Sequence, residues 1–104
     1  MAQMIVIYKT PRDPTAFDRH YLDVHVPLAR RLPGLRKLET NRGPIISLYG
    51  ASDAHLVATL RFESLSDINA ALMSACGRAC AADHQRLAPH VNDVQMFLFD
   101  TQSL

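Results

Sequence analysis

The first and last β-strands that the sequence predicts are apolar on both of their faces. Met4–Tyr8 is a short β-branched run that ends at a proline-rich turn, and Val91–Phe99 is the last strand. In that strand, one face carries Val94, Met96 and Leu98, and the other carries Phe97 and Phe99. A half-solvated strand alternates apolar and polar side chains, so these two strands need cover on both sides. The chain must therefore form a sheet with an apolar layer against each face.

Between these strands the apolar residues twice follow a helical rhythm. The first helix begins with either Asp13 or Thr15 as its cap and ends at Pro33–Gly34. Its expected buried stripe consists of Phe17, Tyr21, Val24, Leu28 and Leu32. The second helix begins at Ser64 or Ser66, is interrupted at Ser74–Gly77, and continues to about Leu87.

Two further strands separate the helices, at Leu35–Arg42 and in a segment that places Leu56, Ala58, Leu60 and Phe62 on one face. An unusually apolar loop, Gly43–Asp53, connects them. The order βαββαβ predicts the α+β class: a ferredoxin-like plait with one antiparallel sheet and two helices on one side. Residues 1–104 are expected to form a single domain. The uncovered apolar sheet face predicts a homodimer in which two sheets pack face to face.

Composition excludes several classes of function. Hydrophobic residues make up 48% of the 104 residues, so the chain is not of the disordered class. A formal net charge of +1 and scattered basic residues argue against nucleic-acid binding. The N-terminal apolar run is too short to span a membrane and has no charged leader, so no membrane association is expected. Cys76 and Cys80 suggest no disulfide framework, which favours a reducing, cytoplasmic location.

His25 is the leading candidate for chemistry, because it lies two residues before Pro27 in an otherwise helical segment. Pro27 lacks an amide hydrogen, crowds the carbonyl of Asp23 and disfavours helical geometry at Val26, so the helix should kink or loosen here. His25 lies about 80° round the helix from Phe17, on the flank of the apolar stripe. A half-buried imidazole there can titrate near neutrality and act as an acid or base. The structural alternative, in which His25 satisfies the freed carbonyls, stays open.

The chain resembles the EthD family, named for a protein associated with ethyl tert-butyl ether degradation. The resemblance covers nearly the whole chain. It rests on Phe17-x3-Tyr21-x3-His25-x-Pro27-Leu28, Leu32-Pro33-Gly34-Leu35, Asn41-Arg42, Ser74-x2-Gly77-Arg78 and Ala81-Ala82-Asp83.

The resemblance implies a dimeric α+β barrel of ferredoxin-like protomers, in agreement with the two-faced strands. Relatives in the broad superfamily include cofactor-independent monooxygenases, lactone isomerases, polyketide cyclases and haem enzymes. The chain departs from the family in the long apolar loop Gly43–Asp53. It also has Cys76 at a position that the resemblance associates with acidic residues.

Tyr21 is a further catalytic candidate, and Tyr8, Tyr49 and Asp83 are candidates for substrate binding. Tyr21, one turn before His25, is expected to assist it, and Tyr8 and Tyr49 are expected to line a cleft, because a phenol combines an apolar body with a polar tip. Core packing is the alternative for Tyr8. Asp83, at the family's acidic position, has three open roles: a helix cap, an ion pair with Arg78 or Arg86, or a partner of a pocket histidine. The remaining histidines without partner spacing, expected at the surface or at strand ends, are His20, His55 and His90.

Cys76, Cys80 and His84 recur every fourth residue and so resemble a row of metal ligands. The outer two are ~12 Å apart along a helix at ~1.5 Å per residue, whereas zinc ligands must converge within ~2.3 Å of one ion. We therefore expect no metal site, and interpret both cysteines as small buried thiols on a packing face.

Three functions are consistent with these features. The first is a small enzyme without an organic cofactor that acts on a hydrophobic small molecule by acid–base or monooxygenase-type chemistry, with His25 and Tyr21 as its catalytic residues. The second is a non-catalytic accessory or ligand-binding dimer, which the apolar loop Gly43–Asp53 favours. The third is haem binding through His25.

Overall fold

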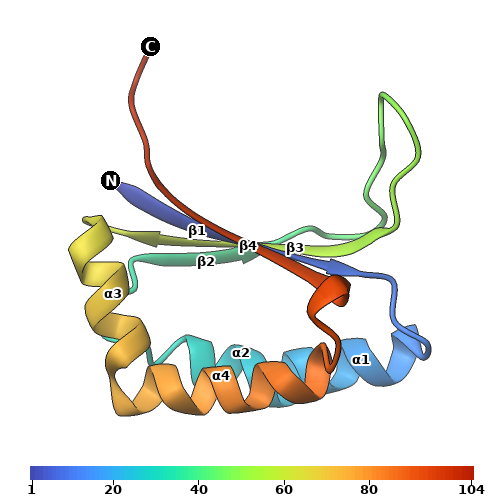
Figure 1. Cartoon of the computed structure of the whole chain (residues 1–104), viewed down its shortest axis with the longest axis horizontal. Helices are drawn as coiled ribbons and strands as arrows, with labels where there is room; N and C mark the ends of the chain where they lie inside the picture. Colours follow the sequence, from blue (N-terminus) through green and yellow to red (C-terminus); the bar gives the residue numbers. More distant parts are fainter.

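Four antiparallel strands form one sheet with all of the helices on one of its faces, as Figure 1 shows. The computed structural model describes all 104 residues. The strands are β1 (Ala2–Lys9), β2 (Lys37–Thr40), β3 (Ala54–Phe62) and β4 (Val94–Asp100), and their order in the sheet is β2-β3-β1-β4. The predicted βαββαβ order and ferredoxin-like plait are therefore confirmed.

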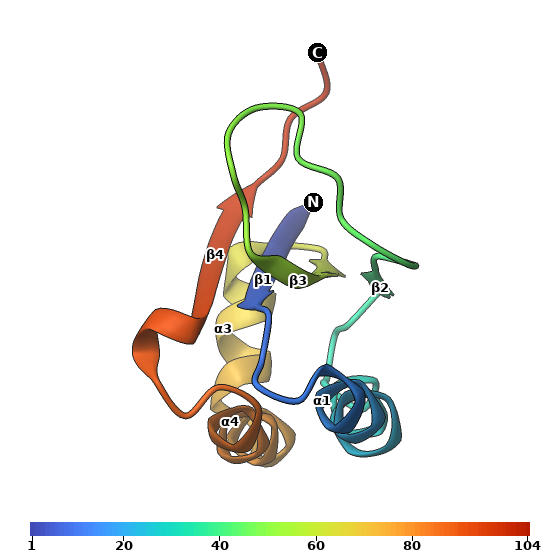
Figure 2. The same ribbon diagram turned by 90° about the vertical axis from the view of Figure 1, so that its right-hand side faces the viewer.

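The helical layer consists of two long segments. The first comprises α1 (Pro14–His20), a π-helical turn η1 (Tyr21–His25) and α2 (Val26–Ala29); the second comprises α3 (Leu65–Met73) and α4 (Ala75–Leu87). A short 3-10 turn, η2 (Val91–Asp93), precedes β4. Figure 2 shows α1 and α4 end-on and side by side beneath the sheet, and α4 also contacts η1 and α2. No helix is both long enough and apolar enough to cross a membrane.

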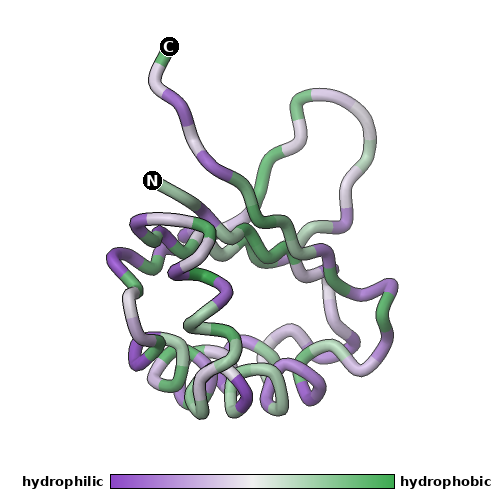
Figure 3. The backbone as a smooth tube through the Cα atoms, turned by 60° about the vertical axis from the view of Figure 1, so that its left-hand side comes forward, coloured by the Kyte–Doolittle hydropathy of each residue, from purple (hydrophilic) through white to green (hydrophobic).

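The core lies between the sheet and this helical layer. Every second residue of β1 and β3 is buried, and the predicted inward face of β3 is confirmed. These inward side chains form one core cluster with Phe17, Tyr21 and Ile68 of the helices. The strand residues in the cluster are Ala2, Met4, Val6 and Tyr8 of β1 and Leu56, Ala58, Leu60 and Phe62 of β3. Figure 3 shows strong hydrophobic colouring along much of the tube where it crosses the sheet in the middle of the molecule.

The first helix loosens before Pro27, as predicted, and it does so through the π-helical turn η1. The amide of Val26 donates to the carbonyl of Tyr21, five residues earlier, so the turn takes up one extra residue. The extra residue moves by one position the side chains that face the core in the turns that follow. Val24, expected in the buried stripe, is 40% exposed, whereas His25 is half-buried and Ala29 is buried. The expected stripe is therefore wrong at Val24, where the π-helical turn interrupts the α-helical spacing, whereas Leu28 is half-buried and Leu32 is buried.

Ser74 forms the corner between α3 and α4. Its hydroxyl accepts the amide of Gly77 and donates to the carbonyl of Ala71, so one residue ends α3 and caps α4. A Cβ at Gly77 would overlap the backbone of Ala71 and Leu72. The predicted helix break is therefore present, and it requires glycine at position 77. Of the two predicted caps for α3, Ser64 is the one used.

The second strand is shorter than predicted. It ends at Thr40. At Asn41 the backbone amide still donates to the carbonyl of Val57, but the amide of Val57 donates to the side-chain Oδ1 of Asn41, whose Nδ2 donates to the carbonyl of Gly43. The last strand begins at Val94 rather than at Val91, because residues 91–93 form η2.

The sheet face opposite the helices is apolar and uncovered. Ile5 of β1 pairs with Phe97 of β4, and Phe97 and Phe99 are 47% and 39% exposed. The loop between β2 and β3 and the C-terminal tail both extend past the sheet on this side (Figure 1). This open face is the one that the strand pattern expected a second apolar layer to cover, and nothing in the chain itself covers it.

Candidate functional site

A cavity of about 460 Å³ lies between the inward face of the sheet and the helices η1, α2 and α4. Its walls are mostly apolar and include Met96 and Leu98 of the edge strand β4. The polar side chains in its lining are Tyr8, Tyr21, His25, Cys80, His84 and Gln85. A cavity of this size, apolar with a few polar groups, is typical of sites for small organic molecules.

His25 faces this cavity from the π-helical turn. Its Nδ1 lies 2.9 Å from Oδ2 of Asp83, and because a carboxylate only accepts, Nδ1 carries the proton and donates it. Nε2 forms no hydrogen bond within the protein and is not sealed from solvent. In the neutral ring, Nε2 is therefore a free proton acceptor at the cavity.

Asp83 lies behind His25 and is 1% exposed. Its second oxygen accepts a hydrogen bond of 2.7 Å from Nε2 of His20, and the Arg86 guanidinium lies 3.5 Å from the same oxygen. Burial alone would raise the pKa of Asp83, but the hydrogen bonds from His20 and His25 lower it below its ordinary value of 3.8. Asp83 thus remains ionised in the core. Of its three open roles, the structure shows the partner of a pocket histidine, with Arg86 rather than Arg78 nearby.

The sequence did not predict the part played by His20. Residues five apart in an α-helix lie about 140° apart round the axis, so His20 and His25 were not expected to share a face. The π-helical turn between them brings both rings to Asp83. The proline at position 27 was the available signal, but it indicated only that the helix would loosen.

Tyr21 stacks on His25, with ring centroids 5.4 Å apart and planes inclined by 27°. Burial raises the pKa of Tyr21 to about 12, so it stays a neutral phenol. Its hydroxyl has no partner in the protein and is not sealed off, although the residue is only 2% exposed. Tyr21 therefore lies beside His25 in the cavity lining, where the sequence placed it.

A second pair joins the sheet to α4 at the same cavity. The hydroxyl of Tyr8 lies 2.8 Å from Nδ1 of His84. Burial raises the pKa of Tyr8, and burial followed by the nearby His25 lowers the pKa of His84 below 6.5. Tyr8 takes both of its expected positions: it packs in the core, 2% exposed, and it lines the cavity. The sequence spacing of His84 indicates only a row of metal ligands, because its pairing with Tyr8 joins residues 76 positions apart.

The two cysteines take packing positions on α4. Cys76 donates a hydrogen bond to the carbonyl of Leu28, and burial raises the pKa of Cys80 to about 11, so Cys80 is a neutral thiol at the cavity wall. No group of three or more histidine, cysteine or acidic side chains is arranged to hold a metal ion.

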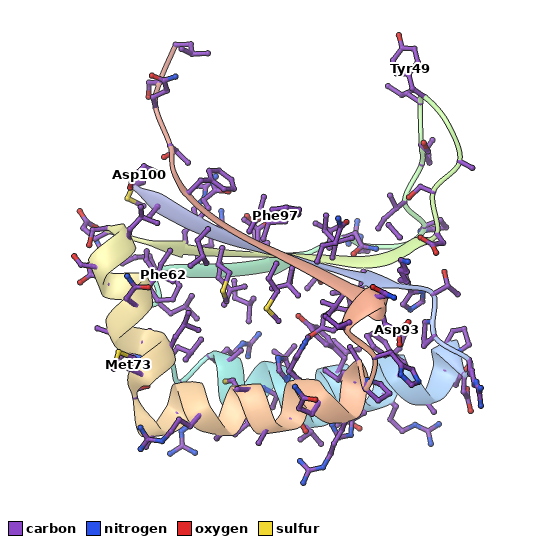
Figure 4. All side chains as sticks on the ribbon, in the orientation of Figure 1. Tyr49, Phe62, Met73, Asp93, Phe97 and Asp100 are labelled. Carbon is purple, nitrogen blue, oxygen red and sulfur yellow. The ribbon has the colours of Figure 1, made fainter.

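Tyr49 does not line the cavity within this chain. It is 94% exposed at the tip of the loop between β2 and β3, on the side of the sheet away from the helices, as Figure 4 shows. Its expected place in a cleft is therefore not found in the single chain, because the loop projects outward instead of folding over the helical layer. His55, which had no partner spacing in the sequence, donates a 2.7 Å hydrogen bond from Nε2 to Oδ1 of Asp18.

A model of the EthD domain matches residues 9–90 of the chain. Over 84 residues, the chain is 37% identical to an uncharacterised 11.0 kDa protein of the thcB–thcC intergenic region in Rhodococcus erythropolis, a match that covers 80% of each protein. The match to the family model spans the first helical segment with His25, the strands β2 and β3, and both α3 and α4.

Solved structures share the fold. A crystal structure of an ethyl tert-butyl ether degradation family protein from Bacillus halodurans superposes with a TM-score of 0.87 at 27% identity, covering 98% of this chain and 99% of that one. SnoaB, a cofactor-independent oxygenase from Streptomyces nogalater, has a TM-score of 0.69 at 14% identity over 99% and 94%. A dimeric ferredoxin-like protein of unknown function from Thermobifida fusca also has a TM-score of 0.69 at 14% identity, over 96% and 90%.

Proposed function

This chain belongs to the EthD domain family. From that membership and the cavity geometry we propose that it is a small enzyme that removes a proton from an apolar small molecule and returns it, with His25 as both base and acid. The observation that carries the proposal is the Asp83–His25 pair. A buried carboxylate at Nδ1 fixes the tautomer and stabilises the imidazolium that forms when Nε2 takes a proton.

The surroundings of His25 suit this role. Apolar walls exclude water from a bound molecule, which strengthens electrostatic interactions with the ring. Tyr21 stacks on the imidazole and presents its hydroxyl nearby, so it can hydrogen-bond a bound molecule next to the proton that moves. We assign Tyr21 as the residue that assists His25.

Removal of a proton from the substrate by His25 is also a suitable first step for an oxygenase reaction. Removing a proton from an organic molecule yields an anion that is more electron-rich than its parent acid and reacts more readily with oxygen. SnoaB, which shares this fold, is a cofactor-independent oxygenase. We therefore include oxygen uptake among the measured quantities.

The experiment is a screen of C–H proton exchange in D2O, followed by NMR, on one- and two-ring carbon acids, with oxygen uptake recorded in parallel for these compounds and for phenols. We expect the wild-type protein to accelerate exchange or oxygen uptake for at least one compound, and His25→Ala to abolish that acceleration. His90→Ala is the matched control, because His90 is exposed and lies outside the cavity lining. A His25→Ala rate equal to that of the wild type would end the assignment.

The second candidate function is a ligand-holding accessory dimer, favoured by the exposed apolar loop in which Ile46 and Leu48 are 84% and 87% exposed. Native mass spectrometry of freshly purified protein and a thermal-shift screen distinguish the two. A bound small molecule that depends on the loop but not on His25 would favour this second function.

We also propose a homodimer in which two open sheet faces pack together. The exposed Phe97 and Phe99 and the half-buried Ile5 form a continuous apolar surface of the kind that mediates association. Proteins of this fold from Thermobifida fusca and a Jannaschia species are described as dimeric. In such a dimer the loop that carries Tyr49 extends toward the partner subunit.

We further propose a cytoplasmic location, because the free thiols of Cys76 and Cys80 suit a reducing environment.

A further inference from the structure

Two imidazoles face the same cavity from different elements. His25 comes from the π-helical turn and is held by Asp83, whereas His84 comes from α4 and is held by Tyr8 of β1. Tyr8 and Tyr21 lie between them in a chain of rings: the centroids are 5.4 Å apart for His25 and Tyr21, 6.0 Å for Tyr21 and Tyr8, and 5.4 Å for Tyr8 and His84. The four rings form one continuous polar edge of an otherwise apolar cavity.

The hydrogen-bond partner of each imidazole bears on its tautomer. Tyr8 remains a phenol because burial raises its pKa, and His84 remains neutral because burial and the nearby His25 lower its pKa. The Tyr8 hydroxyl and Nδ1 of His84 can form this hydrogen bond in either direction; when the phenol donates to Nδ1, the neutral ring of His84 carries its hydrogen on Nε2. His25, which donates from Nδ1 to Asp83, has its lone pair on Nε2.

We propose that Nε2–H of His84 binds the oxygen of a carbonyl substrate while Nε2 of His25 removes a proton from the carbon next to that carbonyl. The electron pair of the broken C–H bond moves into the C–C bond, the carbonyl π pair moves to oxygen, and the resulting enolate oxygen is held by His84. Return of the proton from His25 to the same or another carbon completes an exchange or a double-bond shift. No oxidant or other co-reactant is consumed.

This inference rests on the proposed function and narrows it to one substrate class, apolar carbonyl compounds with an acidic neighbouring C–H. The cavity of about 460 Å³ with mostly apolar walls suits one or two fused rings. Environments that leave one imidazole as an acceptor and the other as a donor are the pattern expected of an acid–base pair. Tyr8 is a positioning residue here, because it acts only by fixing the tautomer of His84.

The donor site is tested separately from proton transfer by the binding of 4-nitrophenol, whose anion absorbs visible light and mimics an enolate. We expect the wild-type protein to bind the anion, and His84→Ala to bind it about 10²-fold more weakly, as is typical for loss of one donor to an oxyanion. Binding of naphthalene, which has no oxygen, should be unchanged. His84→Gln keeps an N–H donor and should recover part of the affinity, and Tyr8→Phe should lose part of it.

The exchange of the α-protons of 2-tetralone in D2O then measures the reaction itself. We expect His25→Ala to abolish exchange and His84→Ala to slow it about 10²-fold, with circular dichroism confirming that both variants are folded. A His84→Ala variant that binds nitrophenolate as tightly as the wild type would overturn the donor site. If the wild type exchanges no carbon acid yet binds the anion through His84, the proton-transfer function fails while the donor site stands.

Discussion

Nδ1 of His25 lies 2.9 Å from Oδ2 of Asp83, which joins a residue of the first helical segment to one of the last. The other oxygen of the same carboxylate accepts from His20 at 2.7 Å. Because both oxygens are occupied by ring N–H groups, the imidazole of His25 cannot rotate without breaking a hydrogen bond to a buried charge. The carboxylate therefore fixes which nitrogen of His25 faces the cavity.

Asp83→Asn should lower the rate of proton exchange by about 10²- to 10⁴-fold, the range found when a base loses its orienting carboxylate. An amide offers one acceptor oxygen, so it cannot serve both His20 and His25 and no longer stabilises an imidazolium. NMR exchange rates on the best compound of the screen give the measurement. Asp100→Asn, at the exposed end of β4, is the control, and equal rates for the two variants would contradict the role of Asp83.

Acid should destabilise the protein partly through Asp83. Its folded pKa is lowered, so between the folded value and the ordinary value of 3.8 the unfolded chain binds more protons than the folded one. The stability that Asp83 contributes is complete above pH 3.8 and is lost as the pH falls through the folded pKa. Urea unfolding at a series of acidic pH values should show a shallower loss for Asp83→Asn than for the wild type.

His84 should give a second pH dependence, closer to neutrality. Its folded pKa is lowered from 6.5, so the unfolded chain takes up a proton first as the pH falls, and the free energy of unfolding decreases below about pH 6.5 until the folded pKa is passed. The groups that act on it are Tyr8, His25 and Asp83. His84→Gln should remove this component below about pH 6.5; a curve that parallels the wild type would show that His84 does not titrate in this way.

Gly77→Ala should destabilise the protein by about 1–3 kcal/mol, the usual cost of overpacking. Alanine normally stabilises a helix relative to glycine, but a Cβ here would overlap the backbone of Ala71 and Leu72 at the α3–α4 corner. Chemical denaturation measures the change. In the reverse control, Ala82→Gly on the exposed face of α4 should cost about 1 kcal/mol from helix propensity alone. A stabilised Gly77→Ala variant would mean that the corner is not packed as described.

Phe97→Asp should convert the proposed dimer to a folded monomer, because it places a charge in the open sheet face without removing a buried side chain. Figure 4 shows Phe97 pointing away from the helices. Sedimentation velocity over a range of concentrations gives the mass. Met73→Asp is the matched control, since Met73 is apolar and 77% exposed but lies at the end of α3. A wild type that remains monomeric at every concentration would refute the dimer.

Local patterns were sufficient to predict the framework. Alternation along the third strand identified Leu56, Ala58, Leu60 and Phe62 as one face, and Ser74 with Gly77 marked the corner between two helices. The apolar character of both faces of the last strand predicted that the sheet needs a second layer. These features depend on neighbours two to four residues away, where backbone geometry fixes which side chains point together.

The cavity chemistry depended on contacts that no local pattern reveals. Asp83 meets His20 across 63 residues and His25 across 58, and Tyr8 meets His84 across 76. The sequence determined that the helix would loosen before Pro27, but only the tertiary structure showed that it does so by a π-helical turn. That turn widens to take up one extra residue, and the resulting shift in register brings both histidines to one buried carboxylate.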